Sequence, residues 1–352
     1  MKPAITIALD AMGGDNAPDM VLGGLVLAKE RFPSAHFLVM GEEARLAPLL
    51  RQHQLSDQTV TIRHAPHAIP SDMKPSQALR QSKQSSMRLA VEAVQSGEAG
   101  AVVSAGNTGA LMAISKIVLR TAPGIDRPAM ASFFPTMRGE SVMLDLGANI
   151  ECHTENLVQF ALMGELFARI VLGLEKPKVA LLNVGSEEMK GHDEVRGAAE
   201  ILRSNDLGLD FHGFIEGDDI AAGTVDVVVT DGFSGNIALK TAEGTAKLYS
   251  HFLRQSFKSS FLAQVGYVFA SRALTKLRMR VDPRRYNGAV LLGLNGIVVK
   301  SHGGTDALGF ATAIGVAIDM AQHGFVQRVR DGLARIDSAP KTPVIAEAAS
   351  DA

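Results

Sequence analysis

Seven short clusters of glycine, aspartate, asparagine, serine or glutamate follow apolar segments of strand length in this chain. The clusters begin at Asp10 (DAMGGDNAP), Ser104 (SAGNTGA), Asp145 (DLGAN), Asn183 (NVGSEEMKG), Glu216 (EGDD), Asp231 (DGFSGN) and Ser301 (SHGG). In an open parallel sheet the carboxyl ends of the strands line one crevice, so we expect the clusters to converge there. Glycine amides and short polar side chains form a surface that suits phosphate.

The first cluster has the composition of an anion-binding turn. Gly13 and Gly14 allow backbone amides to approach an anion closely, and the following helix adds the partial positive charge of its N-terminus. Asp10 and Asp15 flank these glycines. A tight turn capped by Asp15 or Asn16 explains the same residues without a ligand, so this cluster gains weight only from its companions.

The second cluster repeats the design, with Gly106, Asn107, Thr108 and Gly109 opening another helix. Asn107 and Thr108 can cap that helix or donate to a phosphoryl or carbonyl oxygen. A polar, cationic group lies upstream, and a solvated helix start is the stronger interpretation of it: Arg80, Lys83, Ser85 and Ser86.

Lys190 lies in a glycine-bearing loop with Glu187 and Glu188 nearby. A lysine held over an anion crevice orients phosphate and stabilises an oxyanion, whereas most lysines are simply exposed on the surface. Asn236 stands at a helix start, and Lys240 follows one turn later.

Lys300 and His302 end the last strong strand. The histidine is suited to proton exchange, and a structural hydrogen bond is the alternative.

Several expected motifs are absent: GxxxxGK[ST], GxSxG and HExxH do not occur. Four aspartates are candidates to meet around Mg²⁺, although loop caps explain them as well: Asp10, Asp15, Asp145 and Asp231. We therefore assign no metal site.

Apolar strand-like segments alternate with helical patterns along most of the chain. The predicted strands are 5–9, 36–40, 59–63, 100–104, 141–146, 178–184, 211–215, 226–230 and 289–300. The predicted helices are 17–31, 85–96, 108–119, 154–173, 192–204 and 306–322. This alternation indicates an α/β fold with a doubly wound, mostly parallel sheet and helices on both faces.

We expect residues 1–330 to form a single large α/β domain, with a helical hairpin inserted at about 244–285 and a flexible tail at 331–352. Net charge is −2, so the whole molecule gives no sign of nucleic-acid binding. The single cysteine, Cys152, excludes an intramolecular disulfide and suits a reducing cytosol. No segment reaches the roughly 20 apolar residues of a spanning helix.

Residues 235–281 break the alternation because they have a helical pattern almost throughout. Between Gly244 and Val281 there are basic residues and no acidic ones. This pattern predicts a basic amphipathic helix pair. It has two interpretations: the pair is a dimer-forming hairpin, or it is a surface that binds anionic lipid or an acidic protein. The residues expected to carry the second are Arg254, Lys258, Phe261, Leu262, Val265 and Arg272.

Eight sequence blocks, in order, resemble the bacterial phosphate acyltransferases of phospholipid synthesis. The blocks are DAMGGDNAP, SAGNTGA, LDLGAN, LLNVGSEEMKG, IEGDDI, TDGFSGNIALKT, YNGAVLLG and KSHGG, within Ile5 to His323. The resemblance implies a fold similar to the isocitrate and isopropylmalate dehydrogenases and the phosphotransacetylases. It implies that acyl-carrier-protein thioester and inorganic phosphate give acyl phosphate and free carrier protein, with no nucleotide. We assign no cofactor, and Mg²⁺ stays an open alternative.

The resemblance also implies a place in the cell and a set of partners. Acyl phosphate would feed a membrane acyltransferase that acylates glycerol 3-phosphate. The helix pair is similar to a dimer element whose apolar tip touches lipid. The expected protein is therefore a cytoplasmic homodimer that binds acyl carrier protein and associates peripherally with the inner face of the cell membrane.

The resemblance makes Lys190 the leading candidate to neutralise phosphate and the oxyanion. Asp10, Asn107, Asn236 and His302 are second-rank positioning or proton-handling residues. The residues assigned to phosphate or substrate binding are Gly13, Gly14, Asp15, Gly106, Thr108, Gly109, Arg80 and Lys240. Two alternatives stay open: another enzyme of the fold group, either a coenzyme A-dependent phosphotransacetylase or a metal-dependent dehydrogenase, and a non-enzymatic scaffold at the membrane surface.

Overall fold

The computed structural model describes residues 5–55, 58–205, 207–280 and 282–337. Eleven strands of this part form one sheet in the order β3-β2-β1-β4-β11-β10-β5-β6-β9-β7-β8. The strands are β1 (Thr6–Asp10), β2 (His36–Gly41), β3 (Val60–His64), β4 (Ala101–Ser104), β5 (Ala129–Thr136), β6 (Gly139–Leu144), β7 (Lys178–Leu182), β8 (Asp210–Ile215), β9 (Val227–Val229), β10 (Ala289–Leu292) and β11 (Ile297–Lys300).

The sheet consists of two parallel groups that run in opposite directions. Strands β3, β2, β1, β4 and β11 are mutually parallel, as are β6, β9, β7 and β8. Between the groups, β10 is antiparallel to β11 and to β5, and β5 is antiparallel to β6. The seven polar clusters therefore do not line one edge of one parallel sheet, as expected above. Three follow the first group and four follow the second.

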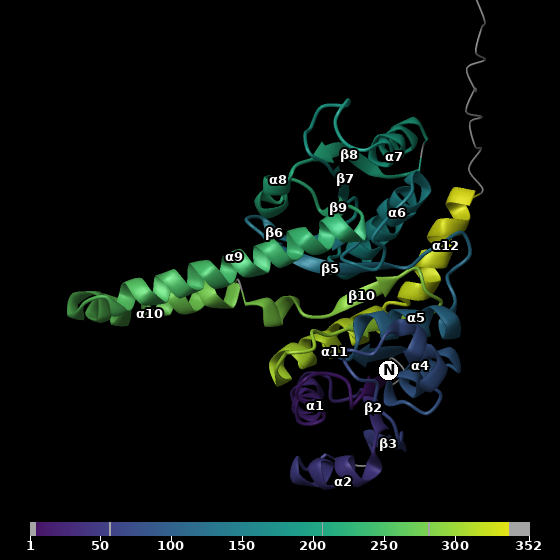
Figure 1. Ribbon diagram of the computed structural model, residues 1–352, viewed down its shortest axis with the longest axis vertical. Helices are drawn as coiled ribbons and strands as arrows, with labels where there is room; N and C mark the ends of the chain where they lie inside the picture. Colours follow the sequence, from purple (N-terminus) through teal and green to yellow (C-terminus); the bar gives the residue numbers. More distant parts are fainter. Residues whose placement is uncertain (1–4, 56–57, 206, 281, 338–352) are drawn as a thin grey trace, which may run out of the picture.

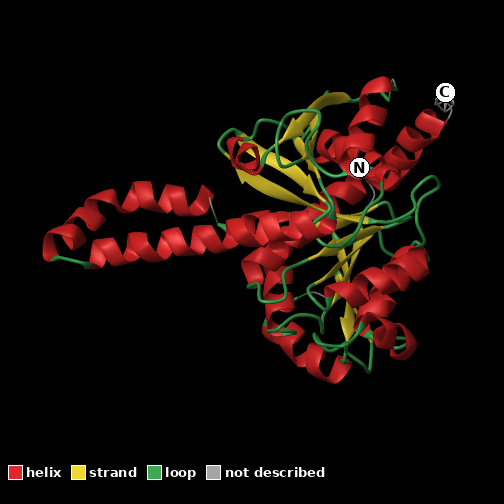
Figure 2. Ribbon diagram, turned by 45° about the horizontal axis from the view of Figure 1, so that its top comes forward, coloured by secondary structure: helices red, strands yellow, loops and turns green. Residues whose placement is uncertain are grey.

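Helices cover both faces of the sheet (Figures 1 and 2). They are α1 (Asp19–Arg31), α2 (Glu43–Gln52), α3 (Pro75–Gln81), α4 (Ser86–Gln95), α5 (Thr108–Leu119), α6 (Thr154–Val171), α7 (Asp193–Ser204), α8 (Gly217–Ala222), α9 (Gly232–Lys258), α10 (Phe261–Arg280), α11 (Ala307–Gln322) and α12 (Phe325–Asp337), with a 3-10 turn η1 (Pro283–Tyr286).

Alternate residues of each strand feed two separate hydrophobic cores. On β1, Ile7 and Leu9 belong to a core that also contains residues of α1 and α11, whereas Ala8 belongs to a second core, with residues of α4 and α5. This two-sided burial explains why the strands are apolar throughout rather than alternating. The mostly parallel sheet with helices on both faces is the fold class predicted from the sequence.

Helices α9 and α10 lie side by side and extend together away from the body (Figure 2). The Phe257 and Tyr267 rings pack against each other across the pair, with centroids 5.4 Å apart. The first turns of α9 begin inside the body, because Gly232 and Gly235 are buried. No helix in the described part of the chain is both long and apolar enough to cross a membrane.

The predicted C-terminal tail differs from the structure at its start. Helix α12 continues to Asp337, past the expected boundary at 331, and Phe325 and Val329 in its first half pack into the core. Residues 338–352 of the predicted tail lie outside the described residues.

Candidate active site

Three residues form a row across the C-terminal ends of the first strand group. Asp10 of β1 pairs in register with Ser104 of β4, which pairs with Lys300 of β11. Residues at matching positions of neighbouring strands point to the same face of a sheet, so the three side chains gather there. All three are buried.

Serine hydroxyl groups hold the Asp10 carboxylate. Ser86, at the start of α4, donates to Oδ1 at 2.6 Å, and Ser104 donates to Oδ2 at 2.6 Å. Burial raises the pKa of Asp10, and the two hydroxyl groups together with the positive charge of Lys300 act in the opposite direction. Ser86 therefore has a definite partner in the interior and is not part of a solvated helix start.

The Lys300 ammonium group lies beneath the polar loops. It donates to the backbone carbonyl of Ala105 at 3.4 Å and to that of Ser301. Burial lowers its pKa to about 8, although Asp10 and Asp15 favour the charged form. A lysine that is only 8% exposed is uncommon and marks a candidate functional group.

Glycines allow the loops above this row to pack closely. A Cβ atom on Gly13 would lie 2.5 Å from Asp10 Oδ2 and 2.7 Å from the amide nitrogen of Gly106. Gly14 has φ +112°, a conformation that suits glycine. The amide of Asp15 donates to the carbonyl of Gly303 at 2.9 Å, so the loops after β1 and β11 are joined.

His302 is held by its own loop and by Asn287. Its backbone amide donates to Asn287 Oδ1 at 3.0 Å, and its Nδ1 accepts from the amide of Gly304 at 3.2 Å. Burial lowers the pKa of His302, and Lys240 is the next largest cause. Because Nδ1 accepts this hydrogen bond, the neutral form of the ring carries its proton on Nε2.

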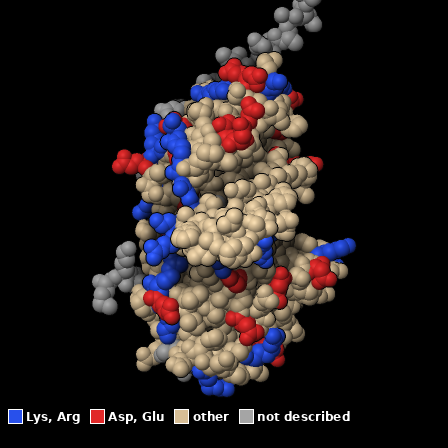
Figure 3. Space-filling model, turned by 90° about the vertical axis from the view of Figure 1, so that its left-hand side faces the viewer, with Lys and Arg blue, Asp and Glu red and all other residues tan. Residues whose placement is uncertain are grey.

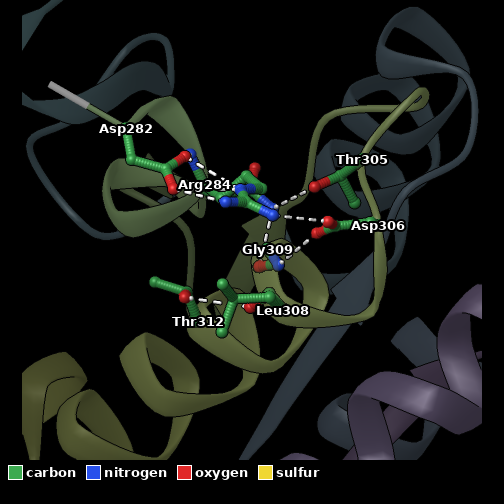
Figure 4. A network of polar contacts seen from close by, with 8 residues as sticks. Asp282, Arg284, Thr305, Asp306, Leu308, Gly309 and Thr312 are labelled. Atoms are coloured by element: carbon green, nitrogen blue, oxygen red, sulfur yellow. Dashed lines mark hydrogen bonds and ion pairs between the residues drawn. The ribbon is translucent and has the colours of Figure 1, made fainter. Parts of the chain in front are cut away.

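Arg284 connects this loop to the chain that returns from α10 (Figure 4). Its guanidinium group donates to Asp282 and also to Asp306, the latter at 2.9 Å. Asp306 in turn caps α11 by accepting from the amide of Gly309 at 3.1 Å. The base of the helix pair is thus linked to the loop that carries His302.

Asn107 is occupied within the fold. Its Oδ1 accepts from the amide of Ala110 at 3.0 Å as an N-cap, and its amide group donates to the carbonyls of Ser71 and Met73 at 2.9 and 2.8 Å. The structure therefore favours its capping role. Thr108 at the start of α5 and Arg80 near the end of α3 are both exposed.

Asp145 organises the second group of clusters. It is buried and accepts backbone hydrogen bonds from Met130, Gly147, Ala148 and Asn149, at 2.7 to 3.3 Å. Burial raises its pKa and these hydrogen bonds oppose that change. So many fixed donors identify Asp145 as a structural loop residue.

Asn236 lies next to the Asp145 loop. A Cβ atom on Gly147 would lie 3.7 Å from Asn236 Cβ. Asp231 caps α9, accepting from the amide of Ser234 at 2.8 Å, and the amide of Gly232 donates to the carbonyl of Asn149 at 2.7 Å. Asn236 is exposed on the first turns of α9.

Lys190 lies at the end of the loop after β7. Its backbone carbonyl accepts from Asn183 Nδ2 at 3.0 Å, and its side chain packs beside Gly185. The side chain is exposed. Its assignment to the reacting centre stays a prediction.

Helix α9 brings the two strand groups together. It begins at the end of β9 and carries Lys240 about 12 Å further along its axis, where the charges of Lys240 and Lys247 act on His302. Lys240 also pairs with Glu243 at 2.8 Å. The cations of α9 therefore lie close enough to the loop of the first group for their charges to act on it.

A large apolar cavity lies on another side of α9. Its volume is about 1420 Å³. It is lined by residues of α9 and α10, by Leu182 at the end of β7 and by Gly217 at the start of α8. Arg254 and Lys258 are its two charged lining residues.

Cys152 is unsuited to nucleophilic catalysis. Burial is the largest cause that raises its pKa to about 11, and the negative charge of Asp145 adds to it. The thiol is therefore protonated at neutral pH.

The described residues contain no group of three or more His, Cys, Asp or Glu side chains able to hold a metal ion. Of the four aspartates considered for Mg²⁺, Asp10 and Asp145 follow strands of different groups, and protein donors bind the oxygens of both.

Three residues of this site were not among the site residues predicted from the sequence: Lys300, Ser86 and Asn287. The available signal for Lys300 was its place directly after three apolar residues and before a glycine cluster, as in Asp10 and Ser104. The signal for Asn287 was its place before Gly288, which has φ +117°. Its hydrogen bonds to Ser301 and Gly309 join segments far apart in the sequence and could not be predicted from it.

The family model described as "Fatty acid synthesis protein" matches residues 5–328. The chain belongs to this family.

Two relatives of this fatty acid synthesis protein family match almost the whole chain. The "Phosphate acyltransferase" of Rhodospirillum centenum is 61% identical over 352 residues, covering 100% of this chain and 99% of the relative. The protein of the same name from Paramagnetospirillum magneticum is 60% identical, covering 97% and 98%. The resemblance drawn from the eight blocks is confirmed.

Solved structures similar to this family member share its fold. A phosphotransacetylase from Streptococcus pyogenes superimposes with a TM-score of 0.62 at 20% identity, covering 90% of this chain and 94% of that one. A branched-chain phosphotransacylase from Enterococcus faecalis gives 0.58 at 14% identity, covering 91% and 99%.

Proposed function

We propose that this protein is a phosphate acyltransferase that moves a fatty acyl group from acyl carrier protein to inorganic phosphate. The observation that carries the proposal is the 61% identity, over the whole chain, with a protein named phosphate acyltransferase. The acyl phosphate then serves a membrane acyltransferase that acylates glycerol 3-phosphate in phospholipid synthesis.

The reaction needs positioning more than activation. A phosphate oxygen attacks the thioester carbonyl carbon, a C–O bond forms, and the carbonyl oxygen becomes an oxyanion. The C–S bond then breaks, and the carrier thiolate leaves and takes up a proton. Phosphate is already anionic near neutral pH, so a protein that holds it in line with the carbonyl needs no serine or cysteine nucleophile. The raised pKa of Cys152 agrees with this route.

In the proposed mechanism Lys190 stabilises the oxyanion, and Asn236 on α9 orients the thioester. The glycine loops of the first strand group hold phosphate, where His302 and Lys240 supply further donors. The support for two cooperating groups is that α9 begins at one and its lysines act on the other. No cofactor enters the scheme, and activity that survives a chelating agent would be expected.

The proposed fold relationship extends to the isocitrate and isopropylmalate dehydrogenases, with α9 and α10 as a protruding basic hairpin. This hairpin would serve three contacts: with a second copy of the chain, with acidic acyl carrier protein, and with lipid. Basic residues on the helices and exposed Phe261 and Leu262 at their junction support the last two, with 78% and 82% exposure. The proposed location is the cytoplasm, peripherally on the inner face of the membrane.

The substrate assay separates this function from its alternatives. Purified protein is given phosphate with acyl carrier protein thioester, with acyl coenzyme A, or with a nicotinamide cofactor and a hydroxy acid. We expect acyl phosphate from the carrier thioester. Formation only from acyl coenzyme A, or reduction of the nicotinamide, would replace the proposal with another enzyme of this fold.

Lys190→Ala tests the catalytic assignment. Loss of one oxyanion donor costs about 10² to 10³ in turnover, so we expect a fall of that size with unchanged folding. Lys176→Ala, in the loop before β7, is the matched control. Near-normal turnover would remove Lys190 from the mechanism, and full complementation of a deficient strain by Lys190→Ala would favour the scaffold.

A further inference from the structure

We propose that Lys300 is the cation that binds inorganic phosphate, from beneath the glycine loops that follow β1, β4 and β11. The inference rests on the function proposed above and adds the residue that recognises the phosphate. It leaves Lys190 with the oxyanion of the thioester.

Lys300 lies at the end of β11, under the loops that follow β4 and β11. It stands in the same cross-strand row as Ser104 and Asp10, and its ammonium group reaches the carbonyls of Ala105 and Ser301. Ala105 and Ser301 each begin a glycine loop, so the charge lies directly under both.

The protein uses only part of the hydrogen-bonding capacity of the Lys300 ammonium group. An ammonium group has three donors, and the two carbonyls use two of them. Among the residues that the structure describes, no ion pair within 4.0 Å joins Lys300 to Asp10, whose oxygens bind Ser86 and Ser104 instead. A buried charge with a free donor is costly, and a bound anion removes that cost.

A carboxylate already lies near this place. The Asp15 side chain lies against the backbone of Gly303 and Gly304, where a Cβ atom would be 3.5 and 3.2 Å from its oxygens, and its charge favours the protonated form of Lys300. Asp15 is exposed, so it can give way to a ligand. The surface around Lys300 thus accommodates an anionic oxygen group.

The far side of this site carries donors of matching chemistry. His302, with Nδ1 accepting from Gly304, has its N–H at Nε2, and Lys240 contributes a second cation from α9. Phosphate would therefore meet the ammonium group of Lys300, the imidazole N–H of His302 and, from α9, Lys240, which also pairs with Glu243.

This arrangement predicts a dependence on pH. The pKa of Lys300 is about 8, and the charged groups that face it are Asp10 on β1, Asp15 in the following loop and Lys240 on α9. Only the protonated lysine attracts an anion, so phosphate affinity should fall as pH rises through about 8. Above that pH, binding should take up a proton, because the anion raises the pKa of the lysine.

Calorimetric titration of the full chain with inorganic phosphate tests the inference, at pH 7 and pH 9 and in buffers of different ionisation enthalpy. We expect wild-type protein to take up a proton at pH 9. Lys300→Met should bind about 10- to 100-fold more weakly at pH 7, the loss of one charge-assisted hydrogen bond. Lys300→Arg should keep binding at pH 7 and lose the weakening at pH 9. Equal phosphate affinity of Lys300→Met and wild type would overturn the proposal.

A second variant covers the case in which Lys300→Met does not fold. Asp10→Asn removes a charge that favours protonated Lys300, so the weakening of phosphate binding should begin at lower pH than in wild type. An unshifted profile would count against Lys300. If phosphate binding depends on Lys300 but no acyl phosphate forms, the proposed function is wrong and this inference stands. If Lys300→Met forms acyl phosphate at an unchanged KM for phosphate, this inference is wrong and the proposed function stands.

Discussion

At the scale of residues, two buried aspartates show how the donors around a carboxylate decide its role. Asp145 is bound mainly by backbone amides, which are fixed by the fold and make it part of the framework. Asp10 is bound by two serine hydroxyl groups and lies near a lysine of lowered pKa. Hydroxyl groups can rotate and a protonated lysine can attract an anion, so the Asp10 site can respond to a ligand.

Cys152→Ala tests the absence of a thiol nucleophile at this scale. The raised pKa, about 11, leaves almost no thiolate at pH 7.5, so turnover should stay within about twofold of wild type. The measurement is acyl phosphate formation at saturating substrate, with thermal unfolding as the folding control. A fall comparable to that of Lys190→Ala would require a covalent acyl-enzyme route instead.

The side-chain environment at this scale was only partly accessible from the sequence. The DAMGG and SAGNTG clusters identified Asp10 and the glycines around it because glycine turns have a local signature. Lys300 has no such local signature, because the sequence does not distinguish a buried lysine from an exposed one. Its significance depends on strand register, which joins residues 10, 104 and 300.

At the scale of elements, buried strands and long helices were predictable and the antiparallel centre of the sheet was not. Strand β5 (AMASFFPT) was missed because its proline and serine interrupt the apolar pattern. The segment 289–300 reads as one strand, yet Gly293 at φ +88° begins a tight turn that separates β10 from β11. These strands reverse the sheet direction, so their omission produced the expectation of a single crevice.

The basic residues of helices α9 and α10 are predicted to bind acyl carrier protein and anionic lipid. Figure 3 looks onto its end: uncharged atoms cover the centre, and lysine and arginine gather along one flank. Changing Arg254, Lys258 and Arg272 together to glutamate should weaken binding to acidic carrier protein and to anionic vesicles, since both contacts use the same sign of charge.

An apolar variant provides the comparison. Phe261→Ser with Leu262→Ser should weaken vesicle binding and leave carrier protein binding intact, because only a lipid interior rewards buried apolar groups. Ile117→Ser, at an exposed position on α5, is the control. Surface plasmon resonance and vesicle sedimentation measure the two contacts. Unchanged binding of the charge variant to both partners would defeat the proposed role of the pair.

At the scale of the whole molecule, the structure connects its two strand groups through one end of the helix pair. Helix α9 starts at the second group, and the charge of its Lys240 acts on His302. The chain returns through α10 to η1, where Arg284 binds the loop of the first group (Figure 4). Whatever contacts the pair from outside is thereby attached to both sides of the proposed site.

A homodimer is the prediction at this scale, since a single chain leaves one face of α9 apolar and exposed. Phe233, Ile237, Leu248 and Phe252 recur at helical spacing on that face, all about half exposed or more. Such a stripe is stable in water when a second apolar surface covers it. Analytical ultracentrifugation should therefore give twice the mass of the chain. Leu248→Glu with Phe252→Glu should give monomers that remain folded, because both side chains are exposed within one chain. Ile117→Glu should stay dimeric; a dimeric double variant would place the contact elsewhere.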